Sequence, residues 1–299
     1  MGLKPHANPK YQYWVVMASK LRCYFNWLAL DGLGPFAAGP VAAIAAAGYD
    51  GIQFVDRVDR VAGREARRLG MCVCGSGRIN EPAEAGAVAG AAADLGLECL
   101  TIHLGWGIED DDEGARLIEA TLTASLMHGI PLYVETHRAT LFQDMQRTVK
   151  FIERFPELRF NGDFSHWYTG SEMVYGGFER KLAFIQPVIE RVRFLHGRIG
   201  NPGCIQVAVA PGDQASYVQH FREMWTRCFA AYLRDPAPQQ EFITFTAELL
   251  GPEIFYARTF NGTEESDRWE QSARLCWIAK ECFRAAEEET NTEILASPQ

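Results

Sequence analysis

The sequence predicts an α/β protein built as a (β/α)8 TIM barrel, and three observations favour this fold. Short apolar runs alternate with longer amphipathic stretches along nearly all of the 299-residue chain. The alternation gives eight strand-then-helix units, which form parallel sheets with right-handed crossovers. No linker or low-complexity segment interrupts them. Eight units at this length match a closed barrel, and a doubly wound open sheet is the alternative.

The first strand has two candidate positions. The segment 12–19 (QYWVVMAS) reads as a strand, but the segment 21–30 is also aromatic and apolar. We expect a single domain over residues 1–299, since this length can bury a full core. Residues 11–250 would form the barrel, and residues 251–299 a closing loop, the last helix and a tail.

Glycines mark the ends of the expected helices in the first half of the chain. Gly48, Gly70, Gly96 and Gly129 each follow an alanine-rich or amphipathic stretch, where glycine favours a helix end. The expected helices are 40–47, 59–69, 81–95 and 113–128. The expected strands between them are 51–55, 71–74 and 99–104.

Prolines mark helix ends in the second half, because proline cannot continue the hydrogen-bond ladder of a helix. A helix over 141–155 ends before Pro156, and Pro187 is expected to kink a helix over 177–190. The expected strands are 131–135, 158–163, 192–196 and 241–248. Helices over 214–233 and 266–289 complete the eight units.

Composition excludes several classes of protein. The formal net charge of -9 argues against a nucleic-acid partner, which would require a basic surface. No apolar run approaches the roughly 20 residues that span a bilayer, so no membrane partner is expected. The eight cysteines form no CxxC pair. We expect reduced, mostly buried thiols and therefore a cytoplasmic protein.

Ionisable residues stand at the ends of five consecutive expected strands. These residues are His103, Glu135, Asp163, His196 and Glu248, with His137, His166 and Arg198 close behind. Carboxylates are rarely buried unless they are paired or bound to a metal. In a (β/α)8 barrel the carboxyl ends of the strands carry the active site, so we place the candidate site there.

Four of these residues form a candidate metal set. Glu135, Asp163, His196 and Glu248 offer three carboxylates and one imidazole. Such a set suits one divalent ion, Mn²⁺, Mg²⁺ or Zn²⁺, with open positions for substrate oxygens. The four are spaced about one strand-helix unit apart, so adjacent strands can bring them together.

The motifs around these residues resemble those of a known family. YVETHR, NGDFSHW, FLHGRIG and FTAELLG, with GYDGIQF at the second strand, are similar to segments of the xylose isomerase-like TIM-barrel superfamily, particularly its sugar isomerase and epimerase branch. The resemblance covers nearly the whole chain. It implies the same four metal ligands, with Glu135 and Glu248 also acting as the acid/base pair.

The resemblance implies a divalent-metal-dependent sugar isomerase or epimerase acting on a sugar, keto-sugar or polyol. The metal would make a C–H beside the substrate carbonyl acidic, and the two glutamates would move the proton through an enediolate. The expected substrate-binding residues are His103, Trp106, His137, His166 and Arg198. Trp167 is expected to form a second aromatic wall of the pocket. The family also implies a homodimer or homotetramer.

Other functions are compatible with parts of the sequence. NGDFSHWYTG and LHGRIGNPG are less typical of epimerases, which leaves a metal-dependent lyase or hydrolase acting on an oxidised keto-sugar or inosose. Gly32-x-Gly34-x-x-Ala37 imitates the fingerprint of an NAD-dependent oxidoreductase, but Pro35 removes an N–H that phosphate would need. An apurinic endonuclease-like nuclease would require further histidines and a less acidic chain.

Each candidate residue also has a structural interpretation. Glu135 and Glu248 could pair with an arginine, and Asp163 could cap the loop that follows it. His196 could be a core histidine whose hydrogen bonds are satisfied. The distinction depends on whether these side chains converge.

Overall fold

The computed structural model, which describes residues 20–235 and 241–296, contains a closed barrel of eight parallel strands. The strands are β1 (Lys20–Asn26), β2 (Gly51–Phe54), β3 (Cys72–Ile79), β4 (Leu100–Leu104), β5 (Leu132–Glu135), β6 (Phe160–Asn161), β7 (Val192–His196) and β8 (Phe242–Ala247). Each strand pairs with the next, and β8 pairs with β1 to close the ring, so that Tyr24 lies between Gly51 and Thr246. The predicted (β/α)8 barrel is confirmed, and the open sheet is excluded.

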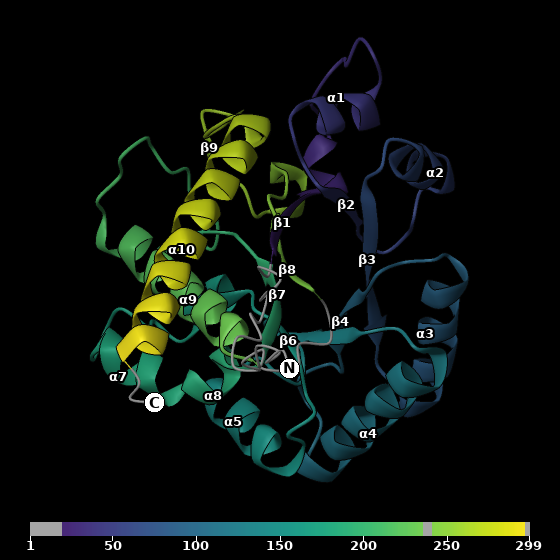
Figure 1. Cartoon of the computed structure of the whole chain (residues 1–299), viewed down its shortest axis with the longest axis vertical. Helices are drawn as coiled ribbons and strands as arrows, with labels where there is room; N and C mark the ends of the chain where they lie inside the picture. Colours follow the sequence, from purple (N-terminus) through teal and green to yellow (C-terminus); the bar gives the residue numbers. More distant parts are fainter. Residues whose placement is uncertain (1–19, 236–240, 297–299) are drawn as a thin grey trace, which may run out of the picture.

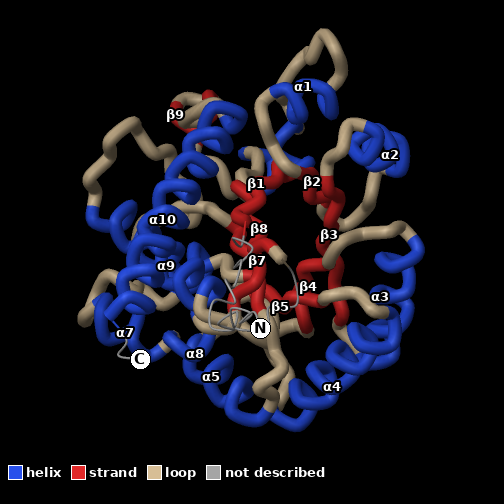
Figure 2. Tube along the Cα trace, viewed as in Figure 1, coloured by secondary structure: helices blue, strands red, loops and turns tan. Residues whose placement is uncertain are grey.

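Helices surround the strands, as Figures 1 and 2 show. They are α1 (Pro40–Ala46), α2 (Arg60–Arg68), α3 (Ala85–Asp94), α4 (Asp111–His128), α5 (Met145–Arg154), α6 (Phe164–Gly170), α7 (Phe178–Phe184), α8 (Gln186–Ile189), α9 (Ser216–Leu233) and α10 (Arg268–Ala296). The helices α9 and α10 pack side by side along one flank of the barrel. None of the helices in the described residues is long and apolar enough to cross a membrane.

Local sequence signals set the helix ends. At the start of α4, the Asp110 side chain accepts hydrogen bonds from the backbone N–H groups of Asp112 and Glu113, and Glu113 reaches back to the Asp110 N–H. This capping box satisfies donors that the first turn leaves free. The helix ends at Gly129, whose φ of 62° is accessible to glycine with little strain.

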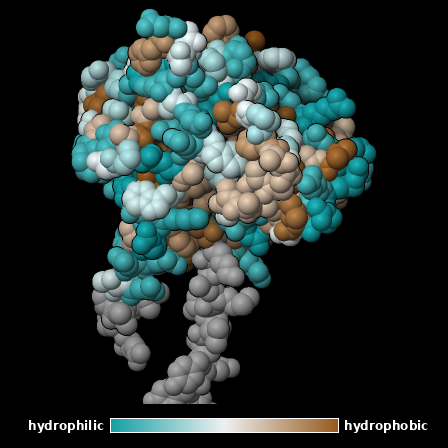
Figure 3. Space-filling view, turned by 90° about the horizontal axis from the view of Figure 1, so that it is seen from above, coloured by the Kyte–Doolittle hydropathy of each residue, from teal (hydrophilic) through white to brown (hydrophobic). Residues whose placement is uncertain are grey.

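Apolar residues fill the layer between strands and helices. Phe25, Ile52, Val134 and Phe245 are buried there with the inner faces of the helices. The face seen in Figure 3 is mostly hydrophilic, with a group of weakly hydrophobic residues right of centre and a few strongly hydrophobic ones elsewhere. Because apolar side chains occupy the layer between strands and helices, the buried polar side chains of the site lie at the carboxyl ends of the strands instead.

Two strands differ from their predicted positions. The first strand, β1, lies within the second candidate segment apart from its first residue, while the segment 12–19 falls outside the described residues. β3 continues beyond Cys74 through a glycine-rich run to Ile79. The glycines make room for the next strand, since a Cβ on Gly75 or Gly77 would lie 3.1 or 3.3 Å from a Leu100 methyl group.

The region around β6 departs most from prediction. The strand is only two residues long, and its pairing with β7 shifts register between Phe160 and Asn161. The unpredicted helix α6 follows at once, and its first five residues are all buried, so it shows no amphipathic pattern. The segment 177–190 forms α7 and α8, which separate at Ile185, before Pro187. A short hairpin, β9 (Thr259–Phe260) with β10 (Thr263–Glu264), was also not predicted.

Candidate active site

The four predicted metal ligands converge at the carboxyl ends of β5 to β8. One ligand atom from each of Glu135, Asp163, His196 and Glu248 lies within 4.8 Å of the others, and all four residues are buried. Glu135 and His196 are the last residues of their strands, while Asp163 and Glu248 follow β6 and β8 closely. Neighbouring parallel strands end at one edge, which is why residues so far apart in the chain meet here.

His196 presents one nitrogen to the carboxylates. Its Nδ1 atom lies 3.3 Å from Glu135 Oε2 and 3.5 Å from Glu248 Oε1, without a hydrogen bond to any described residue. On the other side of the ring, Nε2 lies 3.0 Å from the amide oxygen of Gln53 on β2. Gln53 also donates from Nε2 to the Thr101 hydroxyl at 3.2 Å, which fixes its oxygen toward the histidine. The Nδ1 lone pair of neutral His196 therefore points at the carboxylates.

Asp163 is both a helix cap and a site carboxylate. Its Oδ1 atom accepts hydrogen bonds from the backbone N–H and hydroxyl of Ser165, in the first turn of α6. The Oδ2 atom pairs with Arg198 Nη2, and Arg198 also lies 3.1 Å from Glu248 Oε2. Asp163 therefore caps the helix that follows it, and Glu248 pairs with an arginine, as their structural interpretations proposed. Both side chains also face His196 and Glu135, so these structural roles do not exclude a role in the site.

Glu135 is held from one side only. Its Oε2 atom accepts a hydrogen bond from Asn161 Nδ2 at 3.0 Å and lies 3.3 Å from His103 Nε2. The other oxygen, Oε1, is buried without a hydrogen-bond partner in the described part of the chain. A buried carboxylate oxygen without a partner is costly, so this atom marks a position where a ligand would bind.

The charges of the site fit one divalent cation. The three carboxylates and the Arg198 guanidinium, all buried, leave two negative charges in excess. Burial lowers the pKa of His196, but Glu248 and Glu135 beside it outweigh burial and raise that pKa to about 9. Burial also lowers the pKa of His103, but Glu135 outweighs it and the pKa is raised. In the metal-free protein, a proton on His196 therefore supplies part of the positive charge that a cation would bring.

The two candidate acid/base glutamates differ electrostatically. Burial raises the pKa of Glu135, but His196 and His103 beside it reverse the shift and hold that pKa well below its usual range. Burial raises the pKa of Glu248, and the lowering by His196 and Arg198 does not cancel it. Environments that push two carboxyl pKa values apart are typical of acid/base pairs.

Three histidines form a row along one wall of the site. The ring centroids of His103 and His137 are 4.2 Å apart, and those of His137 and His166 are 3.9 Å apart. His166 Nε2 lies 3.1 Å from Arg198 Nη2. Burial and the neighbouring His166 lower the pKa of His137 to about 3, so this ring is neutral at ordinary pH. The structure therefore brings His103, His137, His166 and Arg198 next to the four candidate metal ligands, and their assignment to substrate binding stays a prediction.

The two tryptophans predicted as pocket walls lie in different environments. Trp106 is 56% exposed at the rim, where the Arg78 guanidinium lies 5.7 Å from its ring centroid. Trp167 is fully buried in α6, and its Nε1 donates to the Phe142 carbonyl at 3.0 Å. The prediction that Trp167 lines the pocket is wrong, because the unpredicted helix turns it into the core.

Several residues of the site were not predicted. Gln53, Asn161 and Ser165 each hydrogen-bond one of the candidate ligands, and each is a polar residue inside one of the motifs that carry the family resemblance. Tyr256 lies in the loop after β8, with its ring 4.7 Å from the Arg198 guanidinium carbon and its hydroxyl 3.5 Å from His137 Nε2. Nothing in the sequence around Tyr256 indicated this position.

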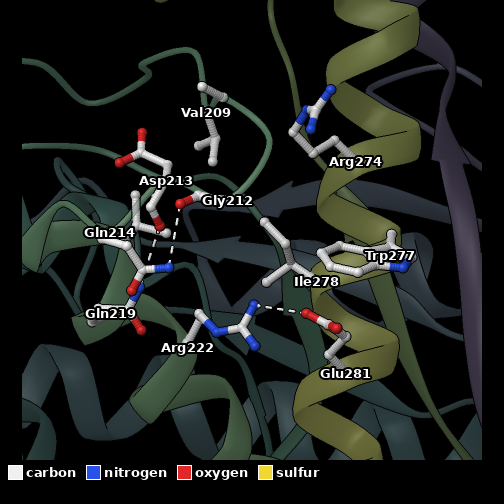
Figure 4. A pocket seen from close by; sticks show the side chains of 12 residues that line it. Val209, Gly212, Asp213, Gln214, Gln219, Arg222, Arg274, Trp277, Ile278 and Glu281 are labelled. Atoms are coloured by element: carbon white, nitrogen blue, oxygen red, sulfur yellow. Dashed lines mark hydrogen bonds and ion pairs between the residues drawn. The ribbon is translucent and has the colours of Figure 1, made fainter.

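A separate pocket lies between α9, α10 and the loop that precedes α9. Its volume is about 190 Å³, and Arg222 of α9 pairs with Glu281 of α10 across it at 3.1 Å (Figure 4). Trp277 and Ile278 line it from α10. None of the predicted site residues lines this pocket, so it is not part of the candidate active site.

Comparisons with known proteins support the fold. No protein-family model matches the sequence, and a search of curated proteins finds no match. Among solved structures, L-ribulose 3-epimerase aligns with a TM-score of 0.58 at 12% identity, covering 94% of this chain and 99% of that one. The probable 3-DHS dehydratase AsbF of petrobactin synthesis from Bacillus anthracis aligns with a TM-score of 0.53 at 13% identity, covering 78% and 94%.

A third solved structure contains a metal ion. A xylose isomerase-like TIM barrel protein from Mycobacterium smegmatis, in complex with magnesium, aligns with a TM-score of 0.50 at 14% identity, covering 88% of this chain and 97% of that one. Identities this low show a shared fold. The chain has the fold of xylose isomerase-like TIM barrels, as the sequence motifs predicted.

Proposed function

We propose that this protein is a divalent-metal-dependent isomerase or epimerase that moves a proton on a sugar, keto-sugar or polyol. One observation carries the proposal: three buried carboxylates and one imidazole converge at four adjacent strand ends, within 4.8 Å of one another. The partnerless Oε1 of Glu135 and Nδ1 of His196 are the atoms that a cation would satisfy.

Glu135, Asp163, His196 and Glu248 would hold the ion. Mn²⁺, Mg²⁺ and Zn²⁺ all suit this set of donors, and the solved magnesium complex with the same fold agrees with such a site. When bound, the ion would act as a Lewis acid that makes a C–H beside a coordinated carbonyl acidic.

Glu135 and Glu248 would carry the proton. They stand at the ends of β5 and β8, with β6 and β7 between them, so their carboxylates reach the site from different directions. One glutamate removes a proton from carbon, and the other returns a proton to the opposite face, which inverts that carbon. Return of the proton to the neighbouring carbon would instead interconvert an aldose and a ketose.

The remaining polar residues would hold the substrate. Arg198 lies within 3.1 Å of both Glu248 Oε2 and His166 Nε2, next to the reacting position. His103 and His137 would bind hydroxyl groups along the histidine row. Trp106 at the rim offers an aromatic face on which the C–H face of a sugar can pack.

A lyase is the second candidate function. The dehydratase with the same fold covers 78% of this chain, and removal of a proton next to a carbonyl is the first step of both reactions. If the substrate, an oxidised keto-sugar or inosose, carried a leaving group β to the carbanion, the same two glutamates would support its elimination.

The proposed function is tested by proton exchange with solvent in the metal-loaded protein. Wild type and Glu248→Gln are incubated in D₂O with a panel of ketoses, keto-sugars and polyols, and deuterium uptake at carbon is followed by NMR. Loss of one acid/base group is expected to slow exchange about 10²–10⁴-fold, while circular dichroism shows that the fold is intact. The matched control is Glu288→Gln on the exposed face of α10.

Product analysis separates the two reactions, because elimination of water lowers the product mass while isomerisation does not. Metal content is measured for every variant so that loss of the ion is distinguished from loss of the proton carrier. Full exchange in Glu248→Gln would contradict the proposal, as would the absence of exchange with every member of the panel.

A further inference from the structure

We propose that the protein binds a second divalent cation, held by His103, His137 and Glu135, so that Glu135 is shared between two adjacent metal positions. This inference goes beyond the proposed function, which requires only the first ion. It concerns two histidines treated so far as substrate-binding residues, and it assigns them a different task.

The geometry of the three residues is that of a metal site. One ligand atom from each of His103, Glu135 and His137 lies within 4.8 Å of the others. His103 Nε2 is 3.3 Å from Glu135 Oε2. Two ligand atoms that each lie about 2.0–2.1 Å from a tetrahedral ion are separated by about 3.3 Å. This pair is therefore already spaced as two ligands of one ion.

His137 is oriented as a ligand. Its Nδ1 atom bonds the backbone carbonyl of Arg138, so this nitrogen carries the proton in the neutral ring. Metal-binding histidines almost always donate their second ring N–H to a carbonyl or carboxylate in this way. The lone pair is then on Nε2, where the Tyr256 hydroxyl lies 3.5 Å away, at the limit of a hydrogen bond.

Glu135 can serve both positions. Its Oε2 atom lies 3.3 Å from His103 Nε2 and equally 3.3 Å from His196 Nδ1, so the carboxylate stands between the two groups of ligands. Its Oε1 atom is buried and has no hydrogen-bond partner in the described part of the chain. A carboxylate can bridge two ions when it lies between their other ligands, and Glu135 lies in this way between His103 and His196.

His103 must exchange one contact to bind. Its Nδ1 atom now lies 3.3 Å from Arg78 Nη2, and arginine can only donate. Coordination through Nε2 places the proton on Nδ1, so the Arg78 side chain, which is exposed, gives up this contact. A residue that accepts a hydrogen bond at position 78 should then strengthen binding of the second ion.

The two positions should prefer different ions. Three carboxylates and one imidazole suit Mg²⁺ or Mn²⁺, whereas two imidazoles and one carboxylate are a donor set of zinc sites with an open position. We therefore expect the second position to accept Zn²⁺ or Co²⁺ and to reject Mg²⁺. Because one divalent ion already balances the site, the second would bring a hydroxide or an anionic substrate oxygen.

The inference is tested by metal stoichiometry on untagged protein. Isothermal titration and elemental analysis are carried out with Mg²⁺, Zn²⁺ and Co²⁺, and the Co²⁺ titration is followed through its visible absorption. We expect one equivalent of Mg²⁺ and two equivalents of Co²⁺ or Zn²⁺ per chain. Saturation of the wild type at a single equivalent of Co²⁺ and Zn²⁺ would overturn the inference without any variant.

Variants test which residues bind the second metal ion. His103→Ala and His137→Ala should each weaken it at least about 100-fold, more than the loss of an outer partner of a ligand costs, and should keep the Mg²⁺ equivalent. Asp163→Asn should lose Mg²⁺ and keep one Co²⁺. Arg78→Gln should tighten binding of the second equivalent, and His128→Ala, at an exposed position at the end of α4, is the matched control. Two Co²⁺ equivalents that survive in both histidine variants would contradict the inference.

Failure of this inference and failure of the proposed function are distinguishable. A protein that binds one ion and exchanges substrate protons retains its proposed function and has no second site. A protein that binds two ions in the predicted positions and exchanges no proton retains the second site and loses the proposed function.

Discussion

At the scale of single residues, Gln53 decides how His196 faces the carboxylates. Its amide oxygen lies 3.0 Å from His196 Nε2, and its amide nitrogen donates to Thr101. In the neutral ring this arrangement places the proton on Nε2 and the lone pair on Nδ1. Outer partners of this kind orient metal ligands and raise their basicity.

Replacing Gln53 should therefore weaken the first metal position. We expect Gln53→Leu to reduce Mg²⁺ or Mn²⁺ affinity about 10–100-fold, because the imidazole loses its acceptor. Titration calorimetry measures the effect. Thr101→Val, which removes the other partner of the same amide, should have the smaller effect, and unchanged affinity in Gln53→Leu would contradict the role of this residue.

The raised pKa of His196 predicts how metal binding depends on pH. Neutral imidazole binds the ion, but below pH 9 the metal-free protein carries a proton there. Binding must then release that proton, so affinity should rise about tenfold per pH unit toward pH 9 and level off above it. Calorimetry in two buffers of different ionisation enthalpy counts the protons. Binding without proton release at pH 7 would show that this pKa is wrong.

At the scale of elements, β7 can approach β8 at its carboxyl end only because the residue there, Gly197, has no side chain. Gly197 lies between His196 and Arg198, and a Cβ there would come within 1.8 Å of the Phe245 ring. Phe245 cannot yield, since it is buried and packs edge-on against Trp225 with 5.0 Å between ring centroids. The close approach of β7 to β8 at this point brings both site residues to their positions.

Gly197→Ala should therefore destabilise the fold and disturb the site together. Overpacking in a core costs about 1–3 kcal/mol, and we expect a loss of at least this size in urea unfolding, with weaker metal binding. Gly170→Ala in α6 is the control, because a Cβ there meets nothing within 4 Å. Equal stability of the two variants would contradict the packing argument.

At the scale of the whole molecule, the candidate metal position joins four consecutive strands. Its residues end β5 and β7 or follow β6 and β8, so unfolding the barrel separates them. An ion that binds only the folded protein stabilises it by mass action. The single domain over residues 1–299, the homodimer or homotetramer and the cytoplasmic location stay predictions.

Divalent ions should consequently raise the melting temperature, and a chelator should reverse the increase. At an ion concentration 100 times the Kd, the expected gain in unfolding free energy is about 2.7 kcal/mol. Calorimetric melts with Mn²⁺, with EDTA and with Asp163→Asn measure it. The variant should melt at one temperature in both conditions, and a wild type that does the same would argue against the site.

The sequence by itself determined the fold class, most of its elements and which polar side chains would converge at the strand ends. Helix caps, glycine stops and apolar runs are local signals, and polar residues at successive strand ends stand out because apolar packing does not require them. Periodicity failed at β6 and α6, where almost every residue is buried and no polar face reveals the helix.

Only the tertiary structure decided how the ligands are supported and which neighbours they share. Gln53 on β2 contacts His196, and Tyr256 in the loop after β8 contacts His137, across separations of 143 and 119 residues. Trp167 turns into the core because the helix α6 places it there. The position of Glu135 between His103 and His196 depends on the closure of the barrel. These contacts join residues distant in the chain, and no local pattern encodes the distance between them.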